Sequence, residues 1–208
     1  AIIYTQHEPA TKLDLWHVPL SGGAAQPLLN TPFNEAQARI SPDGRWISFL
    51  STLSGRSEIY LQPFPGPGER VTVSSGGGLQ AKWRADGKEL FYLSPEGTMM
   101  SVDVRPGSIL DLGTPRPLFR TRLRPAGALD QYVVTADGQR FIVMEPPADA
   151  PLDAGKPILL PMHHQQRQLQ LRQLIGQVVD ETNDLPQRGD GDLAVAVEGI
   201  GLVVVHHV

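Results

Sequence analysis

Residues 37–45 read Gln-Ala-Arg-Ile-Ser-Pro-Asp-Gly-Arg, and this pattern returns twice further along the chain. The second copy, Gln-Ala-Lys-Trp-Arg-Ala-Asp-Gly-Lys, occupies residues 80–88, and the third, Gln-Tyr-Val-Val-Thr-Ala-Asp-Gly-Gln, occupies residues 131–139. The copies begin 43 (80 − 37) and 51 (131 − 80) residues apart. The longer interval holds the Pro- and Gly-containing segment 105–129, where a loop insertion costs little. Such a period is typical of proteins built from repeated structural units.

Each copy carries an Asp-Gly pair that predicts a tight β-hairpin. In residues 41–44, proline presets φ for the first central position of a type I turn, and aspartate suits the second. The glycine that follows takes a left-handed conformation as a bulge. Turn chemistry therefore accounts for Asp43, Asp86 and Asp137, which we interpret as structural residues and not as acidic ligands of a site.

Short apolar runs rich in β-forming residues follow each turn, at 46–50, 90–93 and 141–144. Their nearly continuous apolar character is typical of strands that neighbouring sheets cover on both faces. Further strands are predicted at residues 14–20, 58–64 and 99–104 for the third position of a blade, and at 70–74 and 116–119 for the fourth. Four strands in 40 to 50 residues are the pattern of a β-propeller blade.

The fold class predicted by these features is all-β: a partial β-propeller of about three to four four-stranded antiparallel blades over residues 1–147. The blades are expected at about residues 1–30, 31–76, 77–122 and 128–146. Three to four blades are the lower limit for a closed ring, so we expect an open arc or a fragment of a larger ring.

The last part of the chain, residues 148–208, is predicted to be a short C-terminal tail of unknown role. Apolar residues from Leu171 to Val178 have the i, i+3, i+4, i+7 spacing of an amphipathic helix, which places a helix at about 165–181. Two apolar runs predict a hairpin at about 193–205. The abrupt change in composition leaves a genuine domain, a fused end and a frameshifted end as open explanations.

The composition excludes several classes of protein. With 21 glycines and 19 prolines among 208 residues, turn formers are frequent, which fits many short strands. The net charge is −4 and the basic residues are scattered, so we expect no nucleic-acid partner. The absence of cysteine excludes disulfides, Cys-ligated zinc and a thiol nucleophile. No apolar run approaches about 18 residues, so no membrane insertion by this segment is expected. The first residues lack an initiator methionine and already read as a strand, so we expect the chain to be a piece of a longer protein.

Several stretches that look like functional motifs have a better structural explanation. Residues 76–81 fit G-x-G-x-x-A, but a strand follows where a phosphate-binding helix would have to begin. Residues 55–59 lack the final glycine of a Gly-x-Ser-x-Gly elbow and lie on a hairpin. The pairs His163-His164 and His206-His207 would point to opposite faces of a strand. We therefore predict no catalytic residue, no cofactor-binding residue, no metal ligand and no cofactor.

The three tryptophans, Trp16, Trp46 and Trp83, lie in or beside predicted strands. Aromatic side chains in blades mostly pack between neighbouring sheets, where burial of their large apolar area is stabilising. We therefore expect them in the core, and a ligand-stacking role fits only a tryptophan near the central opening of the ring.

The hairpin at residues 41–49, followed by residues 55–60, resembles the blades of the TolB-type, WD-repeat-like propeller family. More narrowly, the chain is similar to propellers at the C-terminal end of some bacterial membrane-bound serine/threonine protein kinases. Further stretches that support the resemblance are residues 30–35, 63–68, 83–92 and 113–119. The resemblance covers roughly residues 1–147 and implies a scaffold, sensor or docking surface, with chemistry supplied elsewhere. The protein-kinase motifs themselves are missing from the sequence.

The predicted function is therefore a non-catalytic protein-interaction, sensor or scaffold propeller, as the exported part of a bacterial receptor-type kinase. Two alternatives stay open: the gate domain of a prolyl-oligopeptidase-like peptidase, and a periplasmic TolB-like envelope scaffold. A protein or small-ligand partner is expected at the propeller face, where Asn34, Glu35, Arg56 and Gln80 are candidate surface positions. The resemblance implies a periplasmic or other extracytoplasmic location, with a cytoplasmic one left open.

Overall fold

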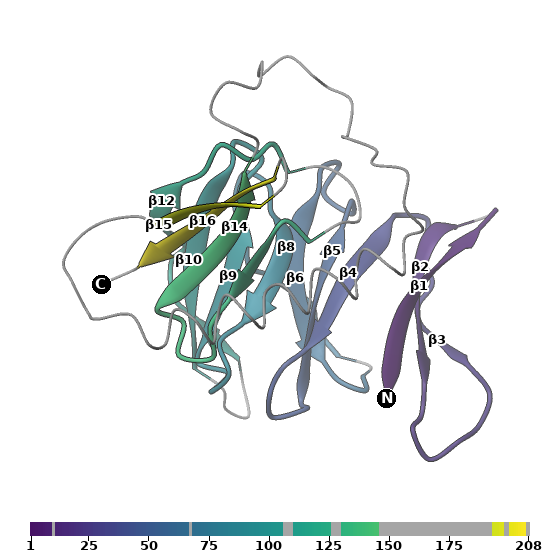
Figure 1. Cartoon of the computed structure of the whole chain (residues 1–208). Coiled ribbons are helices and arrows are strands. Elements are labelled where there is room, and N and C mark those ends of the chain that lie inside the picture. Colours follow the sequence, from purple (N-terminus) through teal and green to yellow (C-terminus); the bar gives the residue numbers. More distant parts are fainter. Residues whose placement is uncertain are drawn as a thin grey trace.

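The computed structural model describes residues 1–9, 11–66, 68–105, 110–125, 130–145, 193–197 and 200–206. Every regular element in this part of the chain is a β-strand, and the strands form four antiparallel sheets (Figure 1). The prediction of an all-β partial propeller is confirmed. No helix in these residues is long and apolar enough to cross a membrane.

The four sheets follow one another along the chain. The first contains β1 (Ile2–Glu8), β2 (Lys12–Val18) and β3 (Gln26–Leu29), in that order. The second contains β4 (Glu35–Ile40), β5 (Trp46–Ser51), β6 (Glu58–Pro63) and β7 (Val71–Thr72). The third contains β8 (Leu79–Trp83), β9 (Glu89–Leu93) and β10 (Thr98–Arg105), with β11 (Asp111–Leu112) and β12 (Arg116–Arg120) both paired to β10. The fourth contains β13 (Tyr132–Val134), β14 (Arg140–Glu145), β16 (Ile200–His206) and β15 (Leu193–Val197), in that spatial order.

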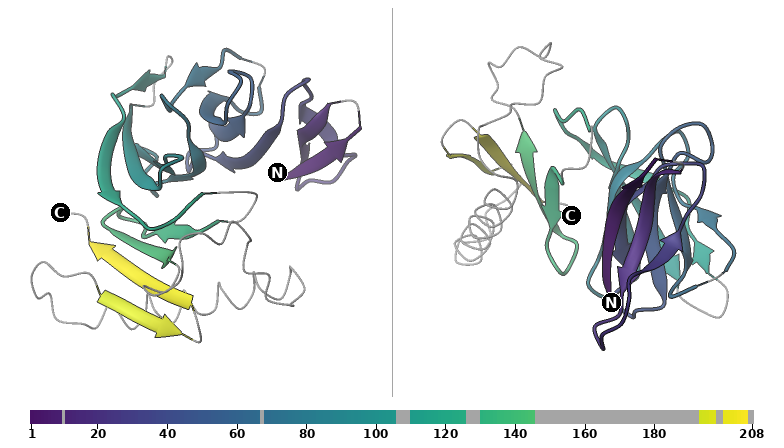
Figure 2. Two further views of the ribbon diagram at one scale, coloured as in Figure 1. Left: turned by 90° about the horizontal axis from the view of Figure 1, so that it is seen from above. Right: turned by 90° about the vertical axis from the view of Figure 1, so that its right-hand side faces the viewer.

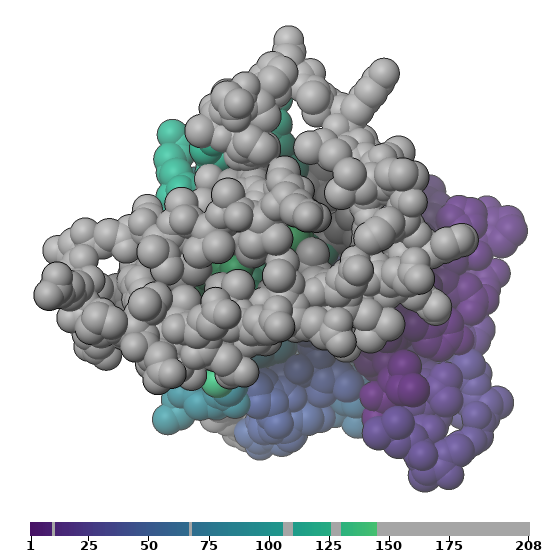
Figure 3. Space-filling model, in the orientation of Figure 1, coloured from purple at the N-terminus to yellow at the C-terminus, as the bar shows by residue number. Residues whose placement is uncertain are grey.

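The sheets are arranged as an arc of blades, from the purple first sheet through blue and teal to the green strands of the fourth (Figure 2, left). The first sheet lies at one end of this arc and is seen at the right of the space-filling view (Figure 3). An apolar layer separates each pair of consecutive sheets, as the blade arrangement requires. The layers contain Leu15, Leu29, Ile47, Phe49 and Tyr60 between the first and second sheets; Leu50, Ile59, Leu61, Val73, Ala81, Leu90, Tyr92, Val102 and Val104 between the second and third; and Phe91, Leu93, Met99, Leu123, Tyr132, Phe141 and Val143 between the third and fourth.

Strand β9 shows why the apolar runs after each turn are continuous. Successive side chains of a strand point to opposite faces. Leu90 and Tyr92 therefore pack toward the second sheet, whereas Phe91 and Leu93 pack toward the fourth. All four side chains are almost fully buried. A strand with both faces covered needs apolar residues at every position, and this is the pattern that the sequence displays.

The predicted Asp-Gly turns are confirmed in all three copies. In the first, Gly44 donates its backbone N–H to the Ser41 carbonyl (2.9 Å), and the Ser41 N–H donates to the Trp46 carbonyl (2.8 Å). The φ of Gly44 is 74°, a left-handed value that glycine adopts without strain. Gly87 and Gly138 have φ of 72° and 77° and close the corresponding turns in the same way. The left-handed glycines and the closing hydrogen bonds are those expected of the predicted hairpin turns.

Two predicted strands have other bounds in the structure, for local reasons. The strand expected at 14–20 keeps its length but lies two residues earlier, at Lys12–Val18, and ends there because Pro19 has no N–H to donate. The strand expected at 70–74 is reduced to Val71–Thr72. There the Ser74 hydroxyl accepts the Ile59 N–H (2.8 Å), so a side chain takes the place of a backbone acceptor.

The fourth sheet contains strands from the predicted propeller, residues 1–147, and from the predicted tail, residues 148–208. Strand β16 pairs with β14 from Arg140↔His206 to Glu145↔Gly201, and β15 pairs with β16 as a hairpin. The amphipathic helix predicted at 165–181 lies outside the described residues. In the described part of the chain, the first sheet has no strand in the position that β4, β8 and β13 take in the other three.

Candidate binding site at the centre of the arc

A ladder of three glutamines joins the second, third and fourth sheets: Gln37 lies in β4, Gln80 in β8, and Gln131 directly before β13. The Gln80 N–H donates to Gln37 Oε1 (2.8 Å), and the Gln131 N–H donates to Gln80 Oε1 (2.8 Å). The Gln80 side-chain amide also donates to Gln131 Oε1 (2.9 Å). Each glutamine is the first residue of a copy of the sequence repeat, so the repeat itself creates the contact between blades.

Two of these glutamines, Gln37 and Gln80, lie at the same kind of backbone irregularity. Between Ala36 and Arg39 on β4, and between Leu79 and Lys82 on β8, the register shifts against the next strand. In both shifts one extra residue is accommodated, which is a β-bulge. Gln37 and Gln80 have positive φ of 55° and 58° at these points. Left-handed conformations are uncommon for residues other than glycine, so a specific contact such as the ladder must hold them.

A pocket of about 310 Å³ lies just beyond the ladder. Its lining consists of the third and fourth residues of all three repeat copies: Arg39 and Ile40, Lys82 and Trp83, Val133 and Val134. The repeat thus brings equivalent positions of three blades to one place. The volume is at the lower end of the range for small-ligand pockets.

The polar part of the site is a carboxylate shared by two cations. Asp130 accepts an ion pair from Arg39 (2.7 Å) and one from Lys82 (2.9 Å). The Lys82 ammonium lies 5.3 Å from the centre of the Tyr132 ring, within cation–π range. The Lys82 side chain is 14% exposed, whereas that of Arg39 is 43% exposed. The site therefore has one well-buried and one half-exposed cation, with a single negative charge between them.

The environment shifts the titration of these groups. Burial lowers the pKa of Lys82, and this effect outweighs the opposing attraction of Asp130. Burial by itself raises the pKa of Asp130, but the charges of Lys82 and Arg39 together bring it below its usual value. Burial also raises the pKa of the Tyr132 hydroxyl, which lies 2.8 Å from the Gln80 carbonyl oxygen and 3.1 Å from that of Phe91. The site therefore brings together the Lys82 amine, the Asp130 carboxyl group and the Tyr132 phenol in surroundings that shift the pKa of each.

These groups are suited to binding. The described residues that line the pocket include no hydroxyl, thiol or imidazole side chain that could act as a nucleophile with a neighbouring base. In the described residues, no group of three His, Cys, Asp or Glu side chains is arranged to hold a metal ion. The arrangement can recognise charge and apolar shape, which are the two properties that a binding pocket needs.

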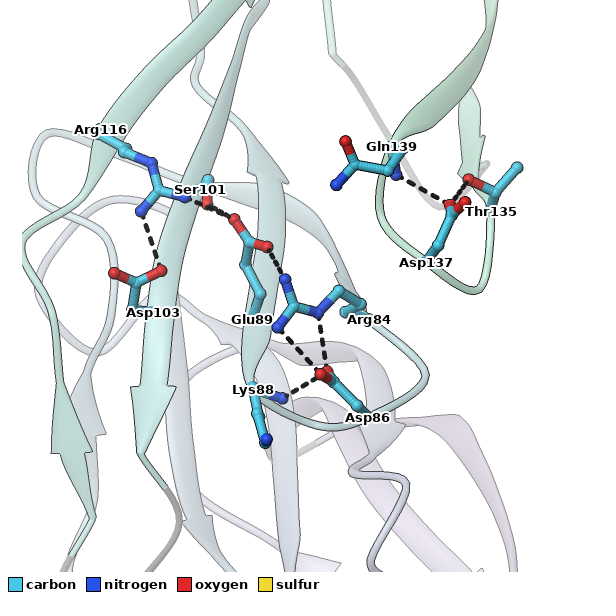
Figure 4. A network of polar contacts seen from close by, with 10 residues as sticks. All are labelled: Arg84, Asp86, Lys88, Glu89, Ser101, Asp103, Arg116, Thr135, Asp137 and Gln139. Atoms are coloured by element: carbon cyan, nitrogen blue, oxygen red, sulfur yellow. Dashed lines mark hydrogen bonds and ion pairs between the residues drawn. The ribbon is translucent and has the colours of Figure 1, made fainter. Parts of the chain in front are cut away.

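The acidic residues of the turns hold their own hairpins together. In the third sheet, Arg84 donates to both carboxylate oxygens of Asp86 (2.8 and 2.9 Å) and forms an ion pair with Glu89 (2.7 Å; Figure 4). Glu89 also pairs with Arg116 (2.8 Å). Hydrogen bonds from Arg84, more than any other contact, lower the pKa of Asp86. Asp43 and Asp137 have lowered pKa values as well, because the Ser41 and Thr135 hydroxyls donate to them.

Four residues were predicted to lie at the surface, and for two of them, Glu35 and Gln80, the prediction is wrong. Gln80 is only 1% exposed because it is the middle residue of the ladder. Glu35 is fully buried, and its carboxylate accepts hydrogen bonds from Thr31 (2.6 Å) and Ser51 (3.1 Å). Asn34 is half-buried. Arg56 is at the surface, with 63% of its side chain exposed, where it forms an ion pair with Glu58 (2.6 Å).

The glycine-rich stretch 76–78 leads directly into β8, with no helix, as predicted. The Gly77 N–H donates to the buried carboxylate of Glu58, with both oxygens at 3.0 Å. The glycine-rich loop therefore stabilises a blade and does not hold a phosphate.

Of the two predicted histidine pairs, residues 163, 164 and 207 lie outside the described residues, and His206 ends β16.

Sequence reasoning did not single out Arg39, Lys82 and Asp130 as a site. One signal was present: the third position of the repeat is a cation in two successive copies, within strands that otherwise read as apolar. Trp83, which we expected in the core, contacts the core between the second and third sheets and also lines the pocket. Asp130 lies just outside the repeat and could not be placed without the tertiary structure.

The chain is similar in part to several known proteins. No family model matches the chain. Over 81 residues, or 37% of this chain, it is 38% identical to the protein named Tricorn protease homolog 1 from Streptomyces coelicolor, of which the match covers 7%. Among solved structures, a putative TolB from Agrobacterium tumefaciens is 17% identical with a TM-score of 0.50, over 71% of this chain and 51% of that one. TolB from Acinetobacter baumannii is 16% identical with a TM-score of 0.41, over 71% and 47%.

The four stacked sheets and the likeness to the Agrobacterium structure define the fold class of this protein: a partial β-propeller. The chain spans about half the length of the TolB chains and a small fraction of the Tricorn protease homolog.

Proposed function

We propose that this chain is a non-catalytic binding module, an arc of propeller blades that holds a protein or small-ligand partner at the pocket in its centre. The observation that carries the proposal is the convergence of equivalent residues from three blades on one pocket. In the part of the chain that the structure describes, its lining consists of the third and fourth positions of the repeat. A fold by itself says little about function, so the proposal depends on this site and not on the propeller shape.

The role of the whole protein is a further part of the proposal. A sensor or docking propeller attached to a receptor-type kinase would use such a pocket to detect a partner outside the cytoplasm. The coding sequence that flanks this chain tests this: a kinase domain upstream, followed by one membrane helix, is the expected finding. Fractionation of cells that express the complete protein tests the extracytoplasmic location.

The match to the Tricorn protease homolog favours a second candidate function. A propeller joined to a peptidase can restrict which substrates reach the catalytic domain, and an arc with a central pocket fits that role. In this case the flanking sequence encodes a hydrolase domain and no kinase. A signal peptide with no further domain would instead favour a free-standing TolB-like envelope scaffold.

Binding at the pocket is tested with a random peptide library displayed on phage and selected on the folded chain. The test variant is Val134→Trp, which fills the pocket, and its matched control is Leu53→Trp at a position that is 41% exposed in a turn of the second sheet. We expect selected peptides to lose at least about tenfold in affinity for Val134→Trp and to keep it for Leu53→Trp. Peptides that bind both variants like the unmodified chain would exclude the pocket as the binding site.

A further inference from the structure

The charge balance of the pocket points to the chemistry of its ligand, if the pocket is the binding site proposed above. Arg39 and Lys82 carry two positive charges, and Asp130 supplies the single negative charge that both contact. Strand β4, which carries Arg39, also contains the acidic residue Glu35. The Glu35 carboxylate accepts hydrogen bonds from Thr31 and Ser51 instead. Among the described residues, the contacts of Arg39 and Lys82 with Asp130 therefore leave one positive charge unbalanced at the pocket.

The two cations are held in place before any ligand arrives. One guanidinium N–H group of Arg39 donates a hydrogen bond to the Ala38 carbonyl (2.9 Å), and another donates to the Asp130 carboxylate (2.7 Å). Lys82 lies over the Tyr132 ring, and Tyr132 is itself fixed by contacts with the Gln80 and Phe91 carbonyls. A positioned guanidinium matches the planar geometry of a carboxylate, and preorganised donors lose little entropy on binding.

The remaining walls are apolar. Ile40, Trp83, Val133 and Val134 line the pocket, and all are partly exposed. The Trp83 indole N–H already donates to the Arg39 carbonyl (3.3 Å), so its ring presents mainly apolar surface to a ligand. A ligand that buries a small apolar group against these side chains gains hydrophobic free energy in addition to its charge contact.

We infer that the pocket binds a carboxylate attached to a small apolar body, and that the ligand carboxylate takes the place of Asp130 between Arg39 and Lys82. Asp130 is then an internal competitor that occupies the anion position in the free protein. The carboxylate can belong to a free organic acid or to an acidic side chain of a peptide, because both present the same group.

The test uses N-acetyl-leucine and its amide, which have the same shape and differ in the carboxylate charge. Binding is followed by NMR through the Val133 and Val134 methyl signals and the Trp83 indole signal. We expect the acid to bind at least about tenfold more tightly than the amide, and the difference to shrink as salt is added. A third probe, acetyl-Leu-Asp-amide, carries its only carboxylate on a side chain. If acetyl-Leu-Asp-amide binds more tightly than N-acetyl-leucine, the natural carboxylate belongs to a peptide side chain. If N-acetyl-leucine binds more tightly, the natural ligand is a free organic acid.

Three variants separate the roles of the charged residues. Arg39→Gln and Lys82→Gln should each weaken binding of the acid about tenfold and leave binding of the amide unchanged. Asp130→Asn should strengthen binding of the acid, since it removes the competitor. Arg105→Gln is the control, because Arg105 is an exposed arginine paired with Asp111 away from the pocket. Thermal unfolding of each variant checks that it is folded.

The results distinguish this inference from the proposed function. If the acid and the amide bind equally while Val134→Trp still abolishes binding of selected peptides, the pocket binds ligands but not through a carboxylate. If Asp130→Asn weakens binding of the acid as much as Lys82→Gln does, Asp130 positions the cations and does not compete, and the inference is wrong. If neither the probes nor the peptides respond to any pocket variant, the proposed function fails too.

Discussion

At the scale of single residues, two glycines in turns differ in how much space surrounds them, and this difference determines the cost of replacing each by alanine. Gly44 and Gly97 both have positive φ, of 74° and 81°. A Cβ on Gly44 would meet nothing within 4 Å, whereas one on Gly97 would lie 2.2 Å from the Leu123 carbonyl oxygen. The two positions therefore separate backbone strain from steric overlap.

We expect Gly44→Ala to lower the free energy of unfolding by about 1 kcal/mol, the cost of a left-handed alanine. Gly97→Ala should cost about 3 kcal/mol, because overlap with the backbone adds to that strain. The Thr121 N–H also donates to the Gly97 carbonyl (2.9 Å) and would be displaced. Urea unfolding of both variants measures the difference, and equal losses would contradict the structure around Gly97.

Glu35 gives a second prediction at this scale, about pH. Burial raises its pKa above the ordinary value of 4.5, against smaller opposing effects of hydrogen bonds from Thr31 and Ser51 and the charge of Arg70. The folded state thus holds the Glu35 proton more tightly than the unfolded state does. Its contribution to stability is fully present below pH 4.5 and is lost as the pH rises through the raised pKa.

Replacement by Glu35→Gln removes this titration and keeps an acceptor for the two hydroxyls. We expect the free energy of unfolding of the unmodified chain to fall relative to that of Glu35→Gln as the pH is raised from below 4.5. Urea unfolding at a series of pH values measures the difference between the two chains. A difference that is constant with pH, or that grows in the opposite direction, would show that Glu35 titrates normally.

At the scale of elements, the contacts between blades depend on a few side chains that the repeat supplies. Gln80 bonds to Gln131 through both its side-chain oxygen and its nitrogen. We expect Gln80→Ala to cost about 1–3 kcal/mol, since the Gln131 N–H loses its acceptor next to the core. Gln139→Ala, at an exposed turn position, should stay within about 0.5 kcal/mol of the unmodified chain. A Gln80→Ala chain as stable as Gln139→Ala would mean that the ladder does not hold the blades together.

Strand β14 gives a second prediction at this scale, because it bonds to a different strand on each edge. The Met144 N–H donates to the Gln131 carbonyl (2.9 Å), on the side of β13. Alternation along the strand places the Ile142 amide on the same side and the Phe141 and Val143 amides on the side of β16.

A chain shortened to residues 1–192 lacks β15 and β16. We expect the Phe141 and Val143 amides to lose protection from hydrogen exchange in this chain, while Ile142 and Met144 stay protected by β13. Exchange measured by NMR on the full and shortened chains makes the comparison. Unchanged protection of Phe141 and Val143 would show that β16 does not pair with β14 in solution.

At the scale of the whole molecule, an arc of blades has two ends that a closed ring would not have. In the described part of the chain, the first sheet lacks a strand beside β1, and Ile2 and Leu20 at this end are 56% and 77% exposed. Unpaired strand edges and exposed apolar side chains favour association.

We therefore expect the isolated chain to be marginally stable and to associate as its concentration is raised. Light scattering coupled to size-exclusion chromatography measures the association, and calorimetry measures the stability. A monomer at all concentrations with a sharp transition well above the usual range for mesophilic domains, about 45–65 °C, would contradict an open arc.

The sequence by itself determined the local features of this protein. The Asp-Gly turns and the strands after them were predicted because turn conformation and side-chain alternation depend on residues next to each other in the chain. The blade repeat followed from the same local patterns. Asp43, Asp86 and Asp137 could be assigned to turns for this reason.

Only the tertiary structure decided which residues of different blades meet. Gln80 and Glu35 were expected at the surface, yet one forms the ladder between blades and the other is buried beside Thr31 and Ser51. The pocket depends on Asp130 reaching Arg39, 91 residues away in the sequence. Such contacts depend on how the sheets stack around the arc, and no local pattern encodes that stacking. The repeat therefore predicted the blades, and their stacking brought its third and fourth positions together around one pocket.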